Sequence, residues 1–541
     1  MDHDDTGDQL PQGYALPPYN TIPALIDWAA AQFGDAEALV QGDLRWNWHE
    51  VRAEIHRVAV ALAGRGVTPG DRVGIWAPNI WEFVTAALGA HAAGASLVPV
   101  NTRFKGAEAA DVLSRSNAKV LFTVTDFLGV DYIDALQTCE AGVPDALEAL
   151  VVLRGTVPEG AVGYADFVAE AGAAAPDQTV AVTDVGGDDL CHIMFTSGTT
   201  GSPKGAMLTH RAVTRAYRDW ADIVGLREGD RYLIINPFFH SFGLNAGVLA
   251  CFIKGATIIP ETVFDVPAVM ARVAEEKVSM LPGPPTLYQT ILMHPDVADH
   301  DLGSLRLAVT GAAAIPVEMI GEIKAKLGFE NIVTGYGLTE ASGMGTMSRF
   351  DDPAEIIVNT CGRAIPGLTV RIVGPDGGEV PRGEAGEIVI KGYSVMRGYL
   401  DDPEKTAETI DANGWLHTGD VGVMDDVGNV KITDRLKDMF IVGGFNAYPA
   451  EIENTMSSHP AVGQVAVVGV PDDRQGEVGY AFIVMAPDQT MPTDEELTAW
   501  CRERMANYKV PRTFAAIDAL PLNASGKVLK NDLRALAQAA D

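Results

Sequence analysis

Cysteine and aromatic residues are scarce in this chain of 541 residues. The five cysteines are widely scattered and have neither the spacing of a metal site nor that of a disulfide framework, so we expect a protein of the reducing cytoplasm. Aromatic residues make up only 7% of the chain, whereas there are 56 glycines and 31 prolines. This composition excludes a fibrous or disordered chain and is typical of a globular enzyme with many tight loops.

Positive charge is also in short supply, because 40 lysines and arginines stand against 72 acidic residues and leave a net charge of -32. Such a field repels the phosphates of nucleic acids and anionic lipid headgroups, so neither is expected as a partner. An anionic substrate must therefore be bound by local hydrogen-bond donors, which we expect in specific loops.

Long uninterrupted apolar runs are missing as well. The two most apolar stretches, 83–100 and 247–260, are broken by His91 and Lys254 and by glycines, so neither is predicted to span a membrane. The N-terminus is acidic and lacks the basic start and apolar run of a secretory signal. We therefore expect no integral contact with a membrane.

The chain is too long for a single hydrophobic core, which predicts several packing units. Residues 1–20 show no periodicity and are interpreted as a loose lead-in. Up to about residue 350, short apolar runs alternate with amphipathic stretches, which predicts an α/β fold with mostly parallel sheets. The expected strands include 72–76, 119–124, 231–235, 278–281 and 305–309. The turn-rich segment 360–434 is predicted to be a small antiparallel β unit, and a compact α+β segment follows it.

The first segment that carries chemistry follows the predicted strand 190–195. Its glycines let backbone N–H groups approach an anion, and its hydroxyls and lysine add further donors. The candidate phosphate-binding residues are Thr196, Ser197, Gly198, Thr199, Thr200, Gly201 and Lys204. The string is not a Walker P-loop, because Gly205 follows Lys204 and the next helix begins only near Thr209. An exposed turn without a ligand is the alternative interpretation.

With this string the chain resembles the acyl-adenylate-forming superfamily, which includes acyl-CoA synthetases, aryl-CoA ligases, firefly luciferases and the adenylation domains of peptide synthetases. Further motifs of that family follow in its order: Pro237-Phe238-Phe239-His240, Gly311-Ala312-Ala313, Tyr336-Gly337-Leu338-Thr339-Glu340, Leu416-His417-Thr418-Gly419-Asp420, Asp434-Arg435-Leu436-Lys437-Asp438 and Pro521-Leu522-Asn523-Ala524-Ser525-Gly526-Lys527. The resemblance covers about residues 20–535. It implies a large N-terminal domain of layered αβ sheets with a small β-barrel unit (21–436), a hinge, and a small mobile α+β C-terminal domain (437–541).

The resemblance assigns the binding of ATP to a further set of residues: Gly311, Ala312 and Ala313 at the adenine, Tyr336 stacked on its ring, Gly337 in the same motif, Thr339 at the α-phosphate, Asp420 at the ribose, and Arg435 at the ribose or the phosphate. Glu340 is expected to hold Mg²⁺, a hard cation that prefers carboxylate and phosphate oxygens. A carboxylate such as Asp420 can accept from both ribose hydroxyls. Taken alone, Glu340 is better explained as a solvated acid than as a metal ligand, and the motif at 336–340 reverses that preference.

Three residues are expected to be catalytic by the same resemblance: Lys527, His240 and Thr339. Lys527 supplies positive charge where the substrate carboxylate attacks the α-phosphate and pyrophosphate leaves. Lys437 occupies the family's hinge position, and His240 its gate between the acyl and thiol channels. The expected CoA-binding residues are Gly443, Gly444, Phe445 and Tyr448. A loop histidine at 240 and a plain β-bulge or turn at 443–448 are the alternatives.

These features predict an AMP-forming carboxylic acid:CoA ligase that uses ATP, Mg²⁺ and CoA. No carrier or condensation domain follows Lys527, which favours CoA over a carrier protein as acceptor; the alternatives left open are acyl transfer to a free-standing carrier protein and a non-catalytic acyl-nucleotide-binding protein. A light-emitting oxidase is disfavoured, because it needs an oxidisable luciferin. The oligomeric state is undetermined, and a homodimer is one alternative.

The acid itself is expected to be hydrophobic. Its pocket walls are predicted at 239–245, 280–286 and 335–343, which mix aromatic, small and apolar residues. These stretches resemble actinobacterial CoA ligases of the fatty-acid type, among them those that activate the ring-derived propanoate left during steroid degradation. A linear fatty acid, an aryl acid and a steroid-derived acid all stay open, because a methylene changes selectivity by only about 1–3 kcal/mol.

Overall fold

The computed structural model describes residues 10, 14–174, 185–196, 203–310, 317–436, 438–442, 445–472, 474–522 and 528–540. These residues form two compact units, each drawn from separate parts of the sequence. The first unit contains the described residues up to 370 together with Ile390–Leu416. The second contains Arg371–Val389 and the described residues from His417 onward.

In the described part of the first unit, the largest sheet has eight strands in the order β18-β9-β8-β4-β3-β5-β6-β7. Their bounds are β3 Arg72–Trp76, β4 Ser96–Pro99, β5 Val120–Val124, β6 Ala149–Arg154, β7 Val162–Gly163, β8 Leu190–Thr196, β9 Lys204–Thr209 and β18 Gly398–Tyr399. All pairs from β8 to β7 are parallel, and the β18-β9-β8 edge is antiparallel. Strand β5 is buried throughout, as expected for a parallel strand covered on both faces. The predicted α/β class is confirmed.

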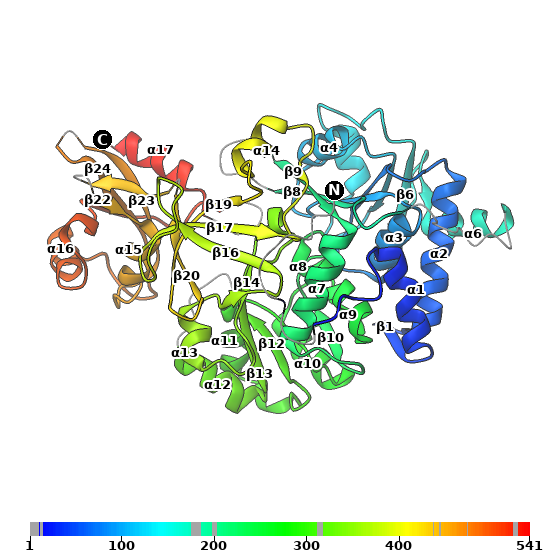
Figure 1. The fold of residues 1–541 in the computed structure, drawn as a ribbon, viewed down its shortest axis with the longest axis horizontal. Coiled ribbons are helices and arrows are strands. Elements are labelled where there is room, and N and C mark those ends of the chain that lie inside the picture. Colours follow the sequence, from blue (N-terminus) through cyan, green and yellow to red (C-terminus); the bar gives the residue numbers. More distant parts are fainter. Residues whose placement is uncertain are drawn as a thin grey trace. The chain divides into compact units, whose positions relative to one another are not determined.

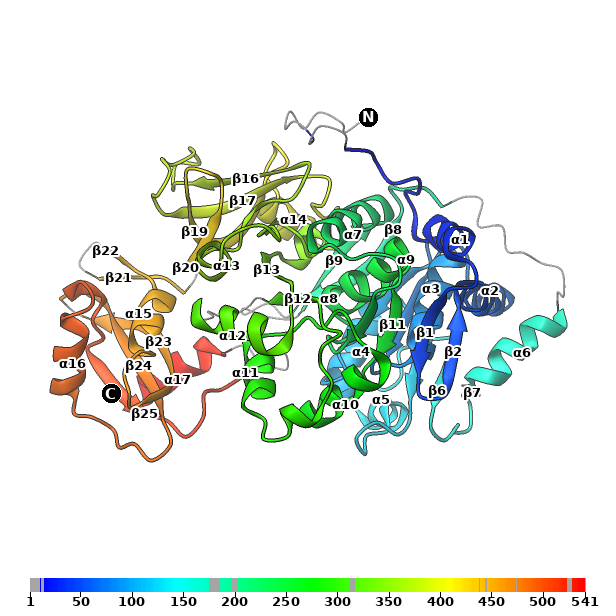
Figure 2. The same ribbon diagram turned by 90° about the horizontal axis from the view of Figure 1, so that it is seen from below.

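Helices alternate with these strands and cover the sheets. The helices before the phosphate-binding segment are α1 Ile22–Phe33, α2 Trp48–Gly64, α3 Trp81–Ala92, α4 Gly106–Arg115, α5 Tyr132–Thr138 and α6 Tyr164–Ala174. Those that follow are α7 His210–Val224, α8 Ser241–Gly243, the π-helix η1 Leu244–Leu249, α9 Ala250–Lys254, α10 Val266–Glu276, α11 Pro285–Met293, α12 Val317–Leu327, α13 Ala354–Asn359 and α14 Pro403–Thr409. Helices α1 and α2 lie side by side in both views (Figure 1 and Figure 2).

Two smaller sheets complete the first unit. One has the order β10-β11-β1-β2, with β1 Glu37–Gln41, β2 Leu44–Asn47, β10 Arg231–Ile234 and β11 Thr257–Pro260; the other runs β12-β13-β14-β15, with β12 Leu307–Thr310, β13 Asn331–Tyr336, β14 Thr346–Met347 and β15 Arg363–Ala364. The strand expected at 278–281 is wrong. Only Met280 pairs there, with Tyr232 and Leu307, and Pro282 and Pro284 then remove the N–H donors that a longer ladder needs.

The N-terminal segment is anchored to the first unit from Tyr14 onward. The Tyr14 hydroxyl lies 2.9 Å from both carboxylate oxygens of Asp219 on α7, and Tyr393 donates to the same carboxylate at 2.9 Å. Tyr19 is buried, and its ring centroid lies 5.1 Å from that of Trp28. The described end of the expected loose lead-in is thus held by a buried carboxylate.

The second unit contains most residues of a sheet in the order β16-β17-β19-β20, with β16 Leu368–Val373, β17 Gly386–Gly392, β19 Leu416–Met424 and β20 Val430–Arg435. The following strands are β21 Phe440–Val442, β22 Phe445–Ala447, β23 Val462–Asp472, β24 Gly476–Met485 and β25 Thr513–Ala516, and the helices are α15 Pro449–Met456, α16 Asp494–Arg502 and α17 Lys530–Ala540. Helix α16 opens with a capping box, in which the side chains of Thr493 and Glu496 each accept from the other residue's backbone N–H. The expected α+β segment is confirmed.

None of the helices in the described ranges is long and apolar enough to cross a membrane.

Candidate active site

The predicted phosphate-binding segment joins two antiparallel strands. Thr196 at the end of β8 pairs with Lys204 at the start of β9. Helix α7 begins only after β9, with Thr209 as its N-cap, so the expected helix start near Thr209 is confirmed. Five candidates between the two strands lie outside the described residues: Ser197, Gly198, Thr199, Thr200 and Gly201. Their binding of phosphate stays a prediction.

Lys204 and Glu340 both contact the side chain of Tyr399. The Lys204 ammonium lies 5.2 Å from the centroid of the Tyr399 ring, and the Tyr399 hydroxyl donates to Glu340 Oε1 at 2.8 Å. Burial, and after it the charge of Glu340, raises the pKa of Tyr399, so its phenol is a permanent donor at neutral pH. The Lys204 ammonium and the Glu340 carboxylate therefore contact the same side chain, that of Tyr399.

The surroundings of Glu340 fit the magnesium site that the resemblance implies. Only Oε1 receives the Tyr399 hydroxyl, and Mg²⁺ is usually held by one or two carboxylates together with substrate phosphates and water. Within the described residues, no group of three or more acidic, histidine or cysteine side chains is arranged to hold a metal by itself. A single carboxylate near a lysine that is expected to bind phosphate suits a cation that arrives with a nucleotide.

The expected adenine-binding segments leave the same edge of one sheet. Strands β12 and β13 are parallel, with Thr310 opposite Thr334, so the segment after Thr310 and the segment that begins with Tyr336 start close together. Tyr336 is half-buried and pairs with Thr346 on β14. Gly337 is exposed, and Thr339 opens the short 3-10 helix η3 Thr339–Ala341. Gly311, Ala312 and Ala313 lie outside the described residues.

His240 is an exposed helix cap. The ring Nδ1 of His240 accepts from the Phe242 backbone N–H at 3.2 Å, and the backbone N–H of His240 donates to the Pro237 carbonyl at 3.0 Å. The chain then enters α8 and the buried π-helix η1, an uncommon geometry that is frequent near functional sites. The cap explains His240 without a ligand, so its gate role stays a prediction.

In the second unit, the backbone places the two expected ribose-binding residues opposite each other. Asp420 on β19 and Arg435 on β20 are register partners. Asp420 is only 8% exposed, and its N–H donates to Thr418 Oγ1 at 3.1 Å. The preceding turn is held by Glu387, whose carboxylate accepts from the Gly419 N–H at 3.0 Å and contacts His417 at 2.7 Å.

The hinge and CoA candidates are only partly described. Lys437, Gly443, Gly444 and Lys527 lie outside the described residues. Phe445 begins β22, where its backbone pairs with Val442, and half-buried Tyr448 is the N-cap of α15.

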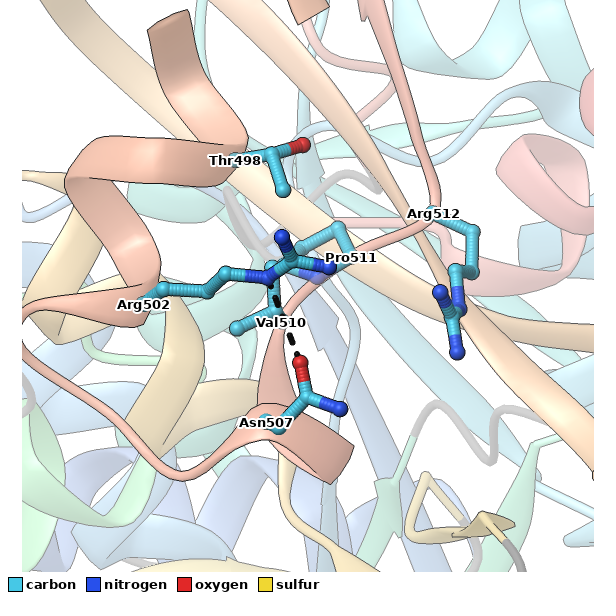
Figure 3. Close-up of a pocket in the computed structure, with 6 residues that line it drawn as sticks. All are labelled: Thr498, Arg502, Asn507, Val510, Pro511 and Arg512. Atoms are coloured by element: carbon cyan, nitrogen blue, oxygen red, sulfur yellow. Dashed lines mark hydrogen bonds between the residues drawn. The ribbon is translucent and has the colours of Figure 1, made fainter. Parts of the chain in front are cut away.

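A small pocket in the second unit contains none of the predicted site residues. Thr498, Arg502, Asn507, Val510, Pro511 and Arg512 line it, as Figure 3 shows. Arg502 Nε donates to Asn507 Oδ1 at 3.3 Å, and both arginines are exposed (Figure 3). The pocket is basic, and we assign no step of the chemistry to it.

Family models cover most of the chain. The model described as AMP-binding enzyme matches residues 26–400, and the model described as AMP-binding enzyme C-terminal domain matches residues 451–527. The chain belongs to the AMP-binding enzyme family. Its membership confirms the predicted resemblance and agrees with the observed fold.

Two characterised relatives resemble this AMP-binding enzyme over almost its whole length. Both are named 3-[(3aS,4S,7aS)-7a-methyl-1,5-dioxo-octahydro-1H-inden-4-yl]propanoyl:CoA ligase. The relative from Rhodococcus jostii is 47% identical, over 95% of this chain and 98% of its own, and that from Mycobacterium tuberculosis is 45% identical, over 95% and 99%. This AMP-binding enzyme is an acid–thiol ligase that forms AMP, as the sequence predicted.

A solved structure supports the fold and the use of a nucleotide. The o-succinylbenzoate coenzyme A synthetase of Bacillus subtilis, in complex with ATP and magnesium ion, matches this AMP-binding enzyme with a TM-score of 0.78 and 28% identity, over 94% of this chain and 98% of that one. The predicted acyl-adenylate synthetase fold is confirmed.

Sequence reasoning missed two residues of this AMP-binding enzyme. Tyr399 lies far along the chain from Lys204 and Glu340, and Glu387 lies on the strand beside β19. Neither belongs to a motif with a phosphate- or metal-binding pattern. The only sequence signal near Tyr399 was the preceding glycine, Gly398. In the structure, the φ of 146° at Gly398 shows why a glycine stands in the short strand β18.

Proposed function

We propose that this ligase activates a hydrophobic carboxylic acid, and that a propanoate attached to a bicyclic, steroid-derived ketone is its preferred substrate class. The observation that carries the proposal is the identity of 47% and 45% to two ligases of one such acid over 95% of the chain. A fatty acid is the second candidate, because the expected pocket walls combine apolar and small residues.

Buried apolar side chains in the first unit support a hydrophobic acid. Phe238, Leu244, Met280 and Leu281 are each fully buried and lie in or beside the predicted walls. An apolar acid bound between the predicted walls would gain free energy from the apolar surface that is removed from water, at roughly 25 cal/mol per Å².

The proposed first half-reaction joins the acid carboxylate to the α-phosphate of ATP, with release of pyrophosphate. Lys204 binds phosphate oxygens, Thr339 orients the α-phosphate, and Lys527 offsets the negative charge that builds up as the carboxylate attacks. Mg²⁺, held by Glu340, supplies further charge neutralisation at the phosphates. Asp420 and Arg435 hold the ribose, and the residues 311–313 with Tyr336 hold the adenine.

The proposed second half-reaction transfers the acyl group from AMP to the thiol of CoA. The C-terminal domain turns about Lys437, and the segment with Gly443, Gly444, Phe445 and Tyr448 then binds the pantetheine arm. His240 separates the acyl and thiol channels. The carbonyl carbon loses its bond to the AMP phosphate oxygen and gains a bond to sulfur, while the thiol proton leaves to solvent or a base.

The test uses the purified full chain with ATP, Mg²⁺ and CoA. AMP and pyrophosphate release is measured against linear fatty acids, aryl acids and bicyclic keto-propanoates, and we expect the highest kcat/KM with the last group. Lys527→Ala should lower adenylation by at least about 100-fold because the attacking carboxylate loses its positioned cation. Lys324→Ala, at an exposed site on α12, is the matched control. Full adenylation by Lys527→Ala, or no release with any acid, contradicts the proposal.

A further inference from the structure

A strained turn follows the residues that are expected to touch the nucleotide. After η3, Ser342 has a φ of 55° and Gly343 a φ of 82°, so two consecutive residues adopt the left-handed conformation. Ser342 is not a glycine, and it is fully buried. Such a conformation persists only where the surroundings fix it, and it is common where a functional group must be held in place.

Tyr217 on α7 contacts both residues of this turn. Its hydroxyl donates to the Ser342 carbonyl at 3.0 Å, and the side chain is only 1% exposed. A Cβ added at Gly343 would lie 2.4 Å from the same hydroxyl oxygen, so the backbone approaches the phenol more closely than any other residue type allows. The Tyr217 hydroxyl therefore fits against this turn only when residue 343 is a glycine.

The other side of the turn is held by the segment that leads to β18. Ser342 Oγ donates to the Ser394 carbonyl at 2.7 Å, and the Met396 N–H donates to the Glu340 carbonyl at 2.8 Å. Tyr399 then binds the Glu340 carboxylate. Tyr217 is thus the described contact that fixes the turn from the side of α7.

Helix α7 is also the direct continuation of the phosphate-binding hairpin. Strand β9 begins at Lys204 and ends at Thr209, which caps α7 by accepting from the Ala212 N–H at 3.3 Å. Tyr217 lies two turns further on. A continuous run of regular structure therefore leads from Lys204 through β9 and α7 to the turn behind Glu340.

We propose that Tyr217 is a positioning residue for adenylation, which sets Thr339 and Glu340 at a fixed distance from Lys204. The proposal rests on the proposed function, because it assigns the spacing to nucleotide binding. In this role Tyr217 does not need to touch the substrate. It acts through the backbone of Ser342 and Gly343.

The test variant is Tyr217→Phe, which removes the hydroxyl and keeps the ring. We expect faster amide hydrogen exchange in the peptide 338–345 of the ligand-free enzyme, and a turnover number for ATP–pyrophosphate exchange that is about tenfold lower, because small misplacements of positioned groups are costly. The KM for CoA should stay within twofold of the unaltered value. Tyr217→Trp is not informative, because its ring does not fit.

The matched control is Tyr132→Phe. Tyr132 is 2% exposed, and its hydroxyl donates to the Thr102 carbonyl at 2.9 Å, so its loss removes the same kind of buried hydrogen bond elsewhere in the first unit. We expect a similar fall in melting temperature but unaltered exchange at 338–345 and unaltered adenylation.

The outcomes separate this inference from the proposed function. Unaltered amide exchange and adenylation in Tyr217→Phe, or equal kinetic losses in both variants, would overturn the positioning role. If the unaltered enzyme forms no adenylate with any acid, the proposed function fails, while the amide-exchange arm still decides whether Tyr217 holds the turn.

Discussion

Tyr399 combines an aromatic face and a hydroxyl, and the structure uses both. The face lies near the Lys204 ammonium, and the hydroxyl binds the Glu340 carboxylate. A hydrogen bond to a charged group contributes about 1.5–3 kcal/mol when it is protected from water, and it also fixes the direction of the carboxylate. The residue therefore orients an expected metal ligand while it keeps a cation in place.

Removing the hydroxyl of Tyr399 should loosen the carboxylate of Glu340. For Tyr399→Phe we expect the Mg²⁺ concentration that gives half-maximal ATP–pyrophosphate exchange to rise roughly fivefold, which corresponds to about 1 kcal/mol. For Tyr399→Leu, which also removes the ring near Lys204, we expect an added rise in the KM for ATP. A Mg²⁺ titration of both variants checks this, and an unaltered Mg²⁺ requirement in Tyr399→Phe contradicts it.

Single residues were predictable where a local string encodes their chemistry. Lys204 and Glu340 lie in such strings, and their family then suggested their roles. Tyr399 and Tyr217 could not be found in this way, because their partners lie more than 50 residues away in the sequence. The hydroxyl of Tyr217 acquires a role only from the fold.

Three elements of the first unit bring buried histidines together. His91 on α3, His192 on β8 and His210 on α7 are each at most 1% exposed, and the ring of His91 lies 4.9 Å from that of His192 and 5.7 Å from that of His210. Burial lowers the pKa of His192 to about 4 and of His210 to about 3, and it lowers the pKa of His91 as well. His192 also contacts Asn245 Oδ1 at 3.0 Å.

These histidines should make the first unit sensitive to acid. Their folded pKa values lie below the unfolded value of about 6.5, so the unfolded chain binds more protons below that pH. The free energy of unfolding should therefore fall as pH drops from about 6.5 towards about 4. His210→Asn keeps an acceptor for the Ile22 N–H and should reduce this slope by up to about 1.4 kcal/mol per pH unit, as urea unfolding at several pH values will show. Equal slopes would refute it.

Elements with strong local signals were predicted well. Helix α7 begins directly after Thr209, where the sequence placed its start, and Gly225, with a φ of 80°, forms its C-cap. The two-residue strand β18 and the π-helix η1 were not predictable. A strand that short has no periodicity, and the apolar run of η1 fits any buried helix.

At the scale of the whole molecule, a net charge of -32 opposes an anionic nucleotide. Lys204 and the expected basic groups act only at short range, whereas the repulsion acts over the Debye length. The sequence predicted both the fold class and this conflict. It could not predict that each compact unit is built from separate stretches of the chain, because the boundaries of the units depend on pairing between strands that are distant in the sequence. The linear domain boundary near residue 437 stays a prediction.

Salt should therefore help the enzyme to capture ATP. Raising the ionic strength from about 0.02 M to about 0.2 M shortens the Debye length from roughly 20 Å to roughly 7 Å. We expect the KM for ATP to fall over this range at fixed free Mg²⁺. The long-range repulsion between the acidic protein and ATP is screened more than the short-range attraction between ATP and the basic groups of the site. Steady-state kinetics in KCl and in a second salt check this. A rising KM would show that local cations dominate the capture.

Because β9 pairs with β18 at the edge of the sheet, this pairing can form only late in the synthesis of the chain. Strand β9 ends at Thr209, but its outer neighbour β18 lies at Gly398–Tyr399, roughly 190 residues later. At about 5–20 residues per second, the backbone of β9 waits roughly 10–40 s on the ribosome without that partner. Unpaired strand edges template aggregation, so the nascent chain needs shielding during that interval. Chains truncated before residue 399 should consequently depend on chaperones more than the full-length chain does.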